Sequence, residues 1–172
     1  MLGLGVVAVS CRNDAQDVQR IRQAPKGPST VQYGVTVVYG DTSDLSWRLT
    51  ADQWHEERTA NGPSREVFSG GVTAVQRANG RATGTLMKAD QVVRDVAART
   101  WELHGNVLLQ AGKKKTLRTE DLYWEREAGR VYGEGWVEIN DQGQRLSGRG
   151  FEALDDLSRY SIFEVSGGMD AD

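Results

Sequence analysis

Few side chains in the sequence could perform chemistry. The chain has two histidines, His55 and His104, and one cysteine, Cys11. This count excludes an internal disulfide and a cysteine-based zinc cluster, and it argues against catalysis that relies on several histidines. His55 has no partner histidine at metal-ligand spacing, and no Gly-x-Ser-x-Gly motif marks a nucleophilic serine. We therefore expect neither a metal nor a cofactor.

The lysines at residues 113–115 follow Gly112 and superficially resemble the end of a phosphate-binding loop. That motif needs a glycine where the chain has Val107, and a helix after the loop. A hairpin tip is the better interpretation of this segment.

Carboxylates are the remaining catalytic candidates. A glycosidase would need two unlike carboxylates facing each other about 5–10 Å apart. Asp52, Asp90, Glu120 and Asp121 instead recur with the internal repeat described below, which indicates structural roles in turns or at exposed edges. We expect the protein not to be an enzyme.

Length and composition set the frame for these residues. A chain of 172 residues is about one domain, and its net charge of −3 argues against a nucleic-acid-binding protein. The 20 glycines against 3 prolines indicate many tight turns. We divide the chain into an N-terminal segment (1–11), a polar linker (12–32), a β domain (33–168) and a short tail (169–172).

The N-terminal segment is apolar up to residue 9 and continues as Ser10-Cys11. This segment resembles the lipobox of bacterial lipoproteins, in which the cysteine is acylated, although no Lys or Arg precedes the apolar run. From this resemblance we expect lipidation at Cys11. Two or more acyl chains there would anchor the protein stably to a membrane. The alternative is a frayed apolar terminus with a buried free cysteine.

From Tyr33 onward, apolar and polar residues alternate with a period of two, which is typical of strands with one buried face. The alternation is clear at Val35, Val37 and Tyr39, and again around Trp101 and Leu103. Turn signals separate the strands at residues 40–41, 61–62, 79–80, 111–112, 128–129 and 141–143. Residues 90–98 come closest to a helical pattern, but we expect a strand with a bulge or turn near Asp95.

An internal repeat connects these strands. The Gly-x-Val pattern occurs at residues 70–72, 105–107 and 135–137. Upstream of each copy, a small residue is followed by an acidic one, within residues 51–53, 89–91 and 119–121. A weaker copy runs from residues 149–151 to 165–167. Bulges or bends at the repeated glycines would fold one long antiparallel sheet into two facing layers. Periodicity leaves two interiors open, a continuous apolar trough or a closed and fully packed sandwich.

Six segments together carry a resemblance to a known family. They are VTVVY at residues 35–39, LTAD at 49–52, LMKAD at 86–90, WELHGNV at 101–107, LRTEDLYW at 117–124 and SGRGFEA at 147–153. In order and spacing, over residues 33–167, they resemble LptC, the periplasmic component of the lipopolysaccharide-export ABC transporter, within the wider LptA/OstA family. The best-known form has a transmembrane helix at its N-terminus, where this chain offers an apolar run and Cys11.

The resemblance implies a curved antiparallel β-jelly-roll, open along one side. It implies a non-catalytic relay that takes lipopolysaccharide from the inner-membrane subunits LptB, LptF and LptG and passes it to an LptA-like bridge protein. Open sheet edges can accept a partner strand. We expect the edge near Val35 to join the transporter and the edge near Ile162 to join the bridge protein, with the domain tethered on the periplasmic side of the inner membrane.

We expect fourteen apolar residues to face the interior, where each could contact either lipid or the protein's own core; the strand parity of Trp124 and Trp136 is ambiguous. The expected interior residues are Val37, Trp47, Leu49, Phe68, Leu86, Trp101, Leu103, Val107, Leu109, Leu117, Leu122, Val137, Ile139 and Phe151. Two other functions remain open: a soluble LptA-like bridge protein, or an unrelated β-sandwich lipoprotein for carbohydrate binding or envelope assembly.

Overall fold

The computed structural model describes residues 30–40, 45–58 and 64–166. Several predictions concern residues outside these ranges and are not tested by it. They are the lipidation at Cys11, the segment 1–11, the linker up to residue 29, the turn at residues 61–62 and the tail 169–172.

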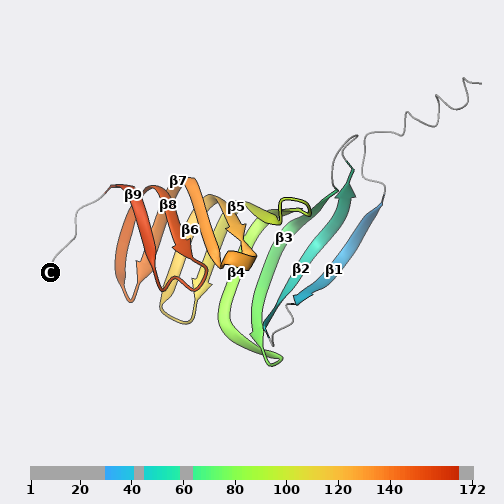
Figure 1. Cartoon of the computed structure of the whole chain (residues 1–172), viewed down its shortest axis with the longest axis horizontal. Coiled ribbons are helices and arrows are strands. Elements are labelled where there is room, and N and C mark those ends of the chain that lie inside the picture. Colours follow the sequence, from blue (N-terminus) through green and yellow to red (C-terminus); the bar gives the residue numbers. More distant parts are fainter. Residues whose placement is uncertain (1–29, 41–44, 59–63, 167–172) are drawn as a thin grey trace, which may run out of the picture.

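The described residues form one antiparallel sheet of nine strands, arranged in the order of the sequence. The sheet is rolled but not closed, and it runs from β1 at one end to β9 at the other (Figure 1). The prediction of an all-β, open antiparallel sheet is therefore confirmed. The strands are β1 (Val31–Gly40), β2 (Leu45–Glu57), β3 (Arg65–Ala78), β4 (Arg81–Asp95), β5 (Thr100–Ala111), β6 (Lys115–Glu125), β7 (Arg130–Asp141), β8 (Gln144–Leu154) and β9 (Tyr160–Val165), with a short 3₁₀ turn, η1 (Arg126–Ala128), before β7.

The predicted turns within the described ranges join consecutive strands. Asn79 and Gly80 both have positive φ, at 49° and 74°, which is the backbone pattern of a two-residue type I′ hairpin turn. β4 ends at Asp95, as predicted, and its Oδ1 atom accepts hydrogen bonds from the backbone N–H groups of Ala97 and Ala98 at 3.0 and 2.9 Å. This side chain therefore closes the β4–β5 turn.

A line of register shifts crosses the sheet at the sequence repeat. The pairing of β3 with β4 shifts between Ser69 and Val72, and the pairing of β5 with β6 shifts between His104 and Val107. Similar shifts occur between β2 and β3, β4 and β5, β6 and β7, and β7 and β8. The repeated Gly-x-Val segments are therefore β-bulges, which bend each strand near its middle.

The repeated acids pack on these bulges. Gly105 has a φ of +74°, and a Cβ atom built there would lie 2.5 Å from Oδ2 of Asp90. The same carboxylate oxygen accepts a hydrogen bond of 2.8 Å from Nδ2 of Asn106. At the previous bulge, Asp52 lies equally close to Gly70. Asp52 and Asp90 thus have structural roles, but these lie at bulges in the middle of strands and not in the turns or at the exposed edges that we predicted.

Because each long strand bends at its bulge, its two halves belong to two facing layers. The pairing places residues 45–50, 73–78, 81–88, 107–111, 115–119, 137–141 and 144–149 in the first layer, and residues 53–57, 65–69, 91–95, 100–104, 121–125, 130–133, 151–154 and 160–162 in the second. The layers are continuous along the bulges. On the opposite side, the strand ends of the two layers meet along a line that we call the seam.

Side chains join the layers at the seam. Among the described residues, no backbone ladder connects the two layers there. Tyr39 of β1 contacts Trp101 of β5 with ring centroids 4.7 Å apart. Further along, Nζ of Lys115 donates a 3.0 Å hydrogen bond to the backbone oxygen of Leu157, and the Tyr160 hydroxyl lies 3.4 Å from Oδ2 of Asp141. A strand of the first layer therefore faces a strand several places further along the sheet in the second layer.

Candidate functional site

The interior between the layers is the candidate site, and nearly all of its buried lining is apolar. Twelve of the fourteen predicted residues are buried in one continuous hydrophobic cluster. These twelve are Trp47, Leu49, Phe68, Trp101, Leu103, Val107, Leu109, Leu117, Leu122, Val137, Ile139 and Phe151. The structure thus brings together residues from β2 to β8.

The other two predicted residues lie differently. Val37, in the edge strand β1, is partly buried and packs against the cluster. Leu86 is outside the cluster, so its predicted interior position is wrong. The neighbouring residues Thr85 and Met87 are both buried, and since side chains alternate along a strand, Leu86 projects from the opposite face.

The prediction missed several interior residues. Val92, Val131 and Met87 obey the strand alternation and could have been identified from it. Trp124, whose parity was ambiguous, is buried, whereas Trp136 is 55% exposed. Leu157 is completely buried although it lies in the β8–β9 turn, where no alternation exists to indicate its position.

A cluster of aromatic rings fills the interior at the seam. The Trp47 ring lies 4.8 Å from the Trp124 ring, and Trp124 lies 5.8 Å from Trp101. The Nε1 atom of Trp124 donates a 3.3 Å hydrogen bond to Oδ2 of Asp155. Burial raises the pKa of the Asp155 carboxyl above its usual value, and the hydrogen bond from Trp124 opposes this effect.

A polar triad covers one end of the aromatic cluster. Oε2 of Glu66 accepts a hydrogen bond of 2.6 Å from Nη1 of Arg94 and one of 3.2 Å from the Tyr39 hydroxyl. The Arg94 guanidinium lies 5.0 Å from the centroid of the Tyr39 ring and 5.5 Å from that of Trp101. Burial raises the pKa of the Tyr39 hydroxyl well above its usual range, and the Glu66 carboxylate raises it further.

The interior is packed in this conformation. A cavity of about 10 Å³ remains between Leu49, Met87, Val92, Trp101 and neighbouring residues. That is roughly the space for one water molecule. Of the two interiors that the sequence left open, the structure therefore has the closed and packed one and not a continuous trough.

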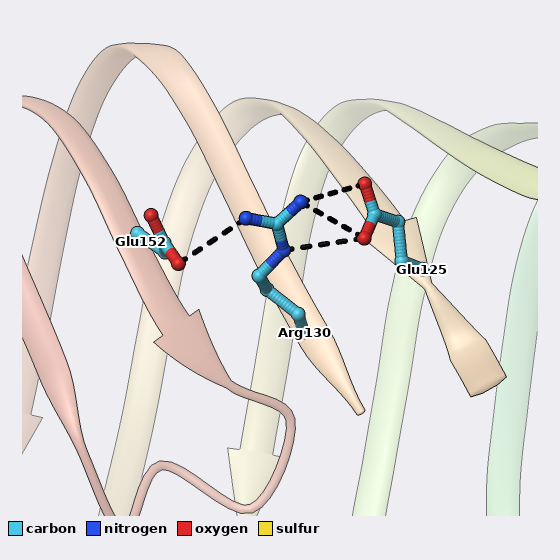
Figure 2. A network of polar contacts seen from close by, with 3 residues as sticks. All are labelled: Glu125, Arg130 and Glu152. Carbon is cyan, nitrogen blue, oxygen red and sulfur yellow. Dashed lines mark hydrogen bonds and ion pairs between the residues drawn. The ribbon is translucent and has the colours of Figure 1, made fainter. Parts of the chain in front are cut away.

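Several charged groups outside this interior pair with one another. Figure 2 shows the Arg130 guanidinium between the carboxylates of Glu125 and Glu152, which extend from neighbouring strands. Its Nη2 atom lies 2.8 Å from Oε1 of Glu125, and its Nη1 atom lies 3.4 Å from Oε1 of Glu152. The hydrogen bonds that Arg130 donates to Glu125 and then to Glu152 raise the pKa of its guanidinium group. This arrangement links β6, β7 and β8 on the outer face.

The histidines are also on outer faces. Nδ1 of His104 lies 2.7 Å from Oδ1 of Asp121, and Nε2 of His55 lies 3.3 Å from Oε1 of Glu57. Among the described residues, no three His, Cys, Asp or Glu side chains are grouped so as to hold a metal ion. No described helix is long and apolar enough to cross a membrane.

Comparison of the chain with protein-family models and with curated proteins gives no match.

Proposed function

We propose that the protein is a non-catalytic relay for lipopolysaccharide of the LptC type, built as an open β-jelly-roll. It accepts lipopolysaccharide from LptB, LptF and LptG and passes it to an LptA-like bridge protein. The observation that carries this proposal is an apolar interior from β2 to β8, enclosed by two layers that only side chains hold together at the seam.

The interior has the chemistry to shelter acyl chains. Exposing one tail of about 12–14 carbons to water costs roughly 10 kcal/mol at about 0.8 kcal/mol per methylene. Separation of the layers at the seam would exchange side-chain contacts between the layers for contacts with the tail, while the backbone pairing within each layer stays intact. The bulge glycines supply bends about which the layers could move.

Both ends of the sheet support docking to partners. Among the described strands, β1 pairs only with β2, and β9 only with β8. Apolar side chains are exposed at both ends, including Tyr33 at 75% and Phe163 at 67%. Unpaired strand edges with exposed apolar residues can be completed by a strand of another protein. We assign the β1 end to the transporter and the β9 end to the bridge protein.

Photo-crosslinking tests lipid entry with a matched pair of leucines. Leu109 is completely buried in the interior, and its neighbour Leu108 is half-buried on the opposite face of β5. A photoreactive residue at position 109 should crosslink to radiolabelled lipopolysaccharide when the transporter hydrolyses ATP, and one at position 108 should not. Equal labelling at both positions, or none at position 109 in a folded protein, would refute the proposal.

The tether is tested separately. We infer that Cys11 carries lipid and holds the domain on the periplasmic side of the inner membrane, since the residues before it resemble a lipobox, although Ala8 stands where leucine is commonest. The Cys11→Ala variant, expressed without its partners, should leave the membrane fraction. Its complete retention there would contradict lipid anchoring, and a mature N-terminus lying beyond Cys11 would instead favour the soluble LptA-like bridge protein.

A carbohydrate-binding or envelope-assembly module is the second candidate, because the interior cavity is only about 10 Å³ and aromatic rings are exposed outside. Trp136 is 55% exposed, and the rings of Tyr123 and Tyr132 stack with centroids 5.4 Å apart. If this candidate is correct, glycan binding should be detectable by calorimetry and should be lost in Trp136→Ala. Crosslinking at position 109 with no glycan binding would favour the lipid relay.

A further inference from the structure

A concavity lies on the outside of the seam, above the Tyr39–Trp101 contact. It has a volume of about 300 Å³, and its lining comes from β1, from the β4–β5 turn with the strand ends beside it, and from η1. The lining residues are Tyr39, Arg94, Val96, Arg99, Trp101, Arg126 and Glu127. We call this concavity the arginine pocket.

The arginine pocket is positively charged although the protein as a whole is negative. Three guanidinium groups line it, and two carboxylates, those of Glu127 in the lining and Glu66 beside Arg94, oppose them. One positive charge remains. Arg126 supplies it, because the described part of the chain shows no carboxylate within ion-pair distance of Arg126.

One of the opposing ion pairs is exchangeable. Nη1 of Arg99 lies 3.3 Å from Oε2 of Glu127, but the two side chains are 72% and 60% exposed. Exposed pairs of this kind contribute little, at about 0–1 kcal/mol. An incoming dianion could therefore compete with Glu127 for Arg99 while also engaging Arg126.

The floor of the arginine pocket leads to the apolar interior. Trp101 lines both the arginine pocket and the small interior cavity. Cationic groups and the ring of Trp101, which also borders the interior, are thus adjacent at the seam. This combination suits an amphiphile whose anionic head stays outside while its tails pass between the layers. A free anion would gain nothing from contact with the aromatic rings.

The geometry points to the arginine pocket as the binding site for a phosphate group of the lipid headgroup, which would position the acyl chains at the seam. This inference rests on the proposed lipid relay and names the part of the ligand that the protein recognises. Guanidinium groups bind phosphate oxygens through paired, charge-assisted hydrogen bonds, for which a lysine is no equivalent.

Binding of purified lipid A to the full-length protein in detergent tests the inference. The probes are lipid A with its phosphates, lipid A from which the phosphates have been removed, and inorganic phosphate alone. Arg126→Gln should weaken binding of the phosphorylated lipid about tenfold, the loss of one charge-assisted interaction, and leave the dephosphorylated lipid unaffected. Arg81→Gln, which alters an exposed arginine outside the pocket, is the control and should change neither affinity.

Three results would overturn the inference. Arg126→Gln could weaken both lipids equally, it could weaken neither, or inorganic phosphate alone could bind as tightly as the phosphorylated lipid, which would make the pocket a site for free phosphate. Crosslinking from position 109 separates this failure from that of the relay. If the crosslink persists, only the headgroup site is wrong, and if the crosslink is absent from the unaltered chain, the relay itself is wrong.

Discussion

The indole ring of Trp47 packs edge-on against that of Trp124, with centroids 4.8 Å apart and planes inclined at 68°. The two residues belong to β2 and β6, which are separated by three strands in the sheet. The contact therefore spans the two layers and depends on the roll of the sheet, since it cannot arise from strand pairing.

Replacing Trp124 should destabilise the protein strongly. Trp124→Ala removes a buried ring that contacts two other indoles, and we expect a loss of about 3–5 kcal/mol in the free energy of unfolding, measured by urea denaturation. Trp136→Ala is the matched control, because Trp136 is 55% exposed, and it should change stability by less than about 0.5 kcal/mol. Equal losses in both variants would contradict the assignment of Trp124 to the seam.

Alanine substitutions at three glycines of the bulges distinguish the stability cost of backbone strain from that of a steric clash. Gly105 combines both effects, since its φ is +74° and a new Cβ atom would clash with Asp90. Gly71 has a φ of +85°, but no atom lies within 4 Å of the position of a new Cβ. Gly135 has neither a positive φ nor a neighbour within that distance. We expect thermal melting to rank the alanine variants in that order. Gly71→Ala should cost roughly 1–2 kcal/mol, with Gly105→Ala costing more and Gly135→Ala little. A Gly105→Ala variant as stable as Gly135→Ala would refute the role of the bulge.

Replacing Asp155 with asparagine should stabilise the folded protein. Asp155→Asn keeps an oxygen for the Trp124 Nε1 donor but removes a half-buried charge, so the variant should be more stable than the wild type at pH 7. Because the pKa of Asp155 is higher in the folded than in the unfolded state, its contribution to stability is present at low pH and is lost as pH rises through the folded pKa. The advantage of Asp155→Asn should therefore vanish near pH 3 and grow above about pH 4.

Asp155→Ala provides the contrast. It removes the charge and also the acceptor, and should cost about 1–3 kcal/mol by leaving the indole N–H without a partner. If Asp155→Asn and Asp155→Ala lose the same stability, the hydrogen bond to Trp124 is not the reason for the aspartate.

The raised pKa of Tyr39 should make the free energy of unfolding depend on pH in the alkaline range. Its pKa is higher in the folded than in the unfolded state, so its contribution is complete below about pH 10 and declines as pH rises further. At pH 8, Tyr39→Phe should cost about 1 kcal/mol, because it removes the hydrogen bond to Glu66. Denaturation at pH 8 and pH 11 should show this difference shrinking, and parallel profiles for the two proteins would contradict it.

Local patterns predicted the strands, most of the turns and the apolar lining, because each depends on neighbouring residues. The Gly-x-Val repeat even located the bulges, where Asp90 packs on Gly105. The choice of Leu86 over Met87 failed because both residues are apolar, and only the parity relative to Ala89 distinguishes the inner face.

Other features could not be derived from alternation. Tyr39 meets Trp101 only because the rolled sheet brings β1 against β5, and the degree of roll is set by the combined twist of all the strands. Leu157 is buried from a turn, and the arginine pocket collects residues far apart in the sequence, including Arg94 and Arg126. No period in the chain marks either of these.

The strict agreement between strand order and chain order has a consequence for how such a molecule can change in size. Every hairpin takes its backbone partners from the units directly before and after it, so duplication or loss of one hairpin would leave the pairing of the others intact. The number of hairpins then determines the length of the sheet from its first strand to its last. Such a change would preserve the backbone pairing, but contacts across the layers such as Trp47–Trp124 would need new partners.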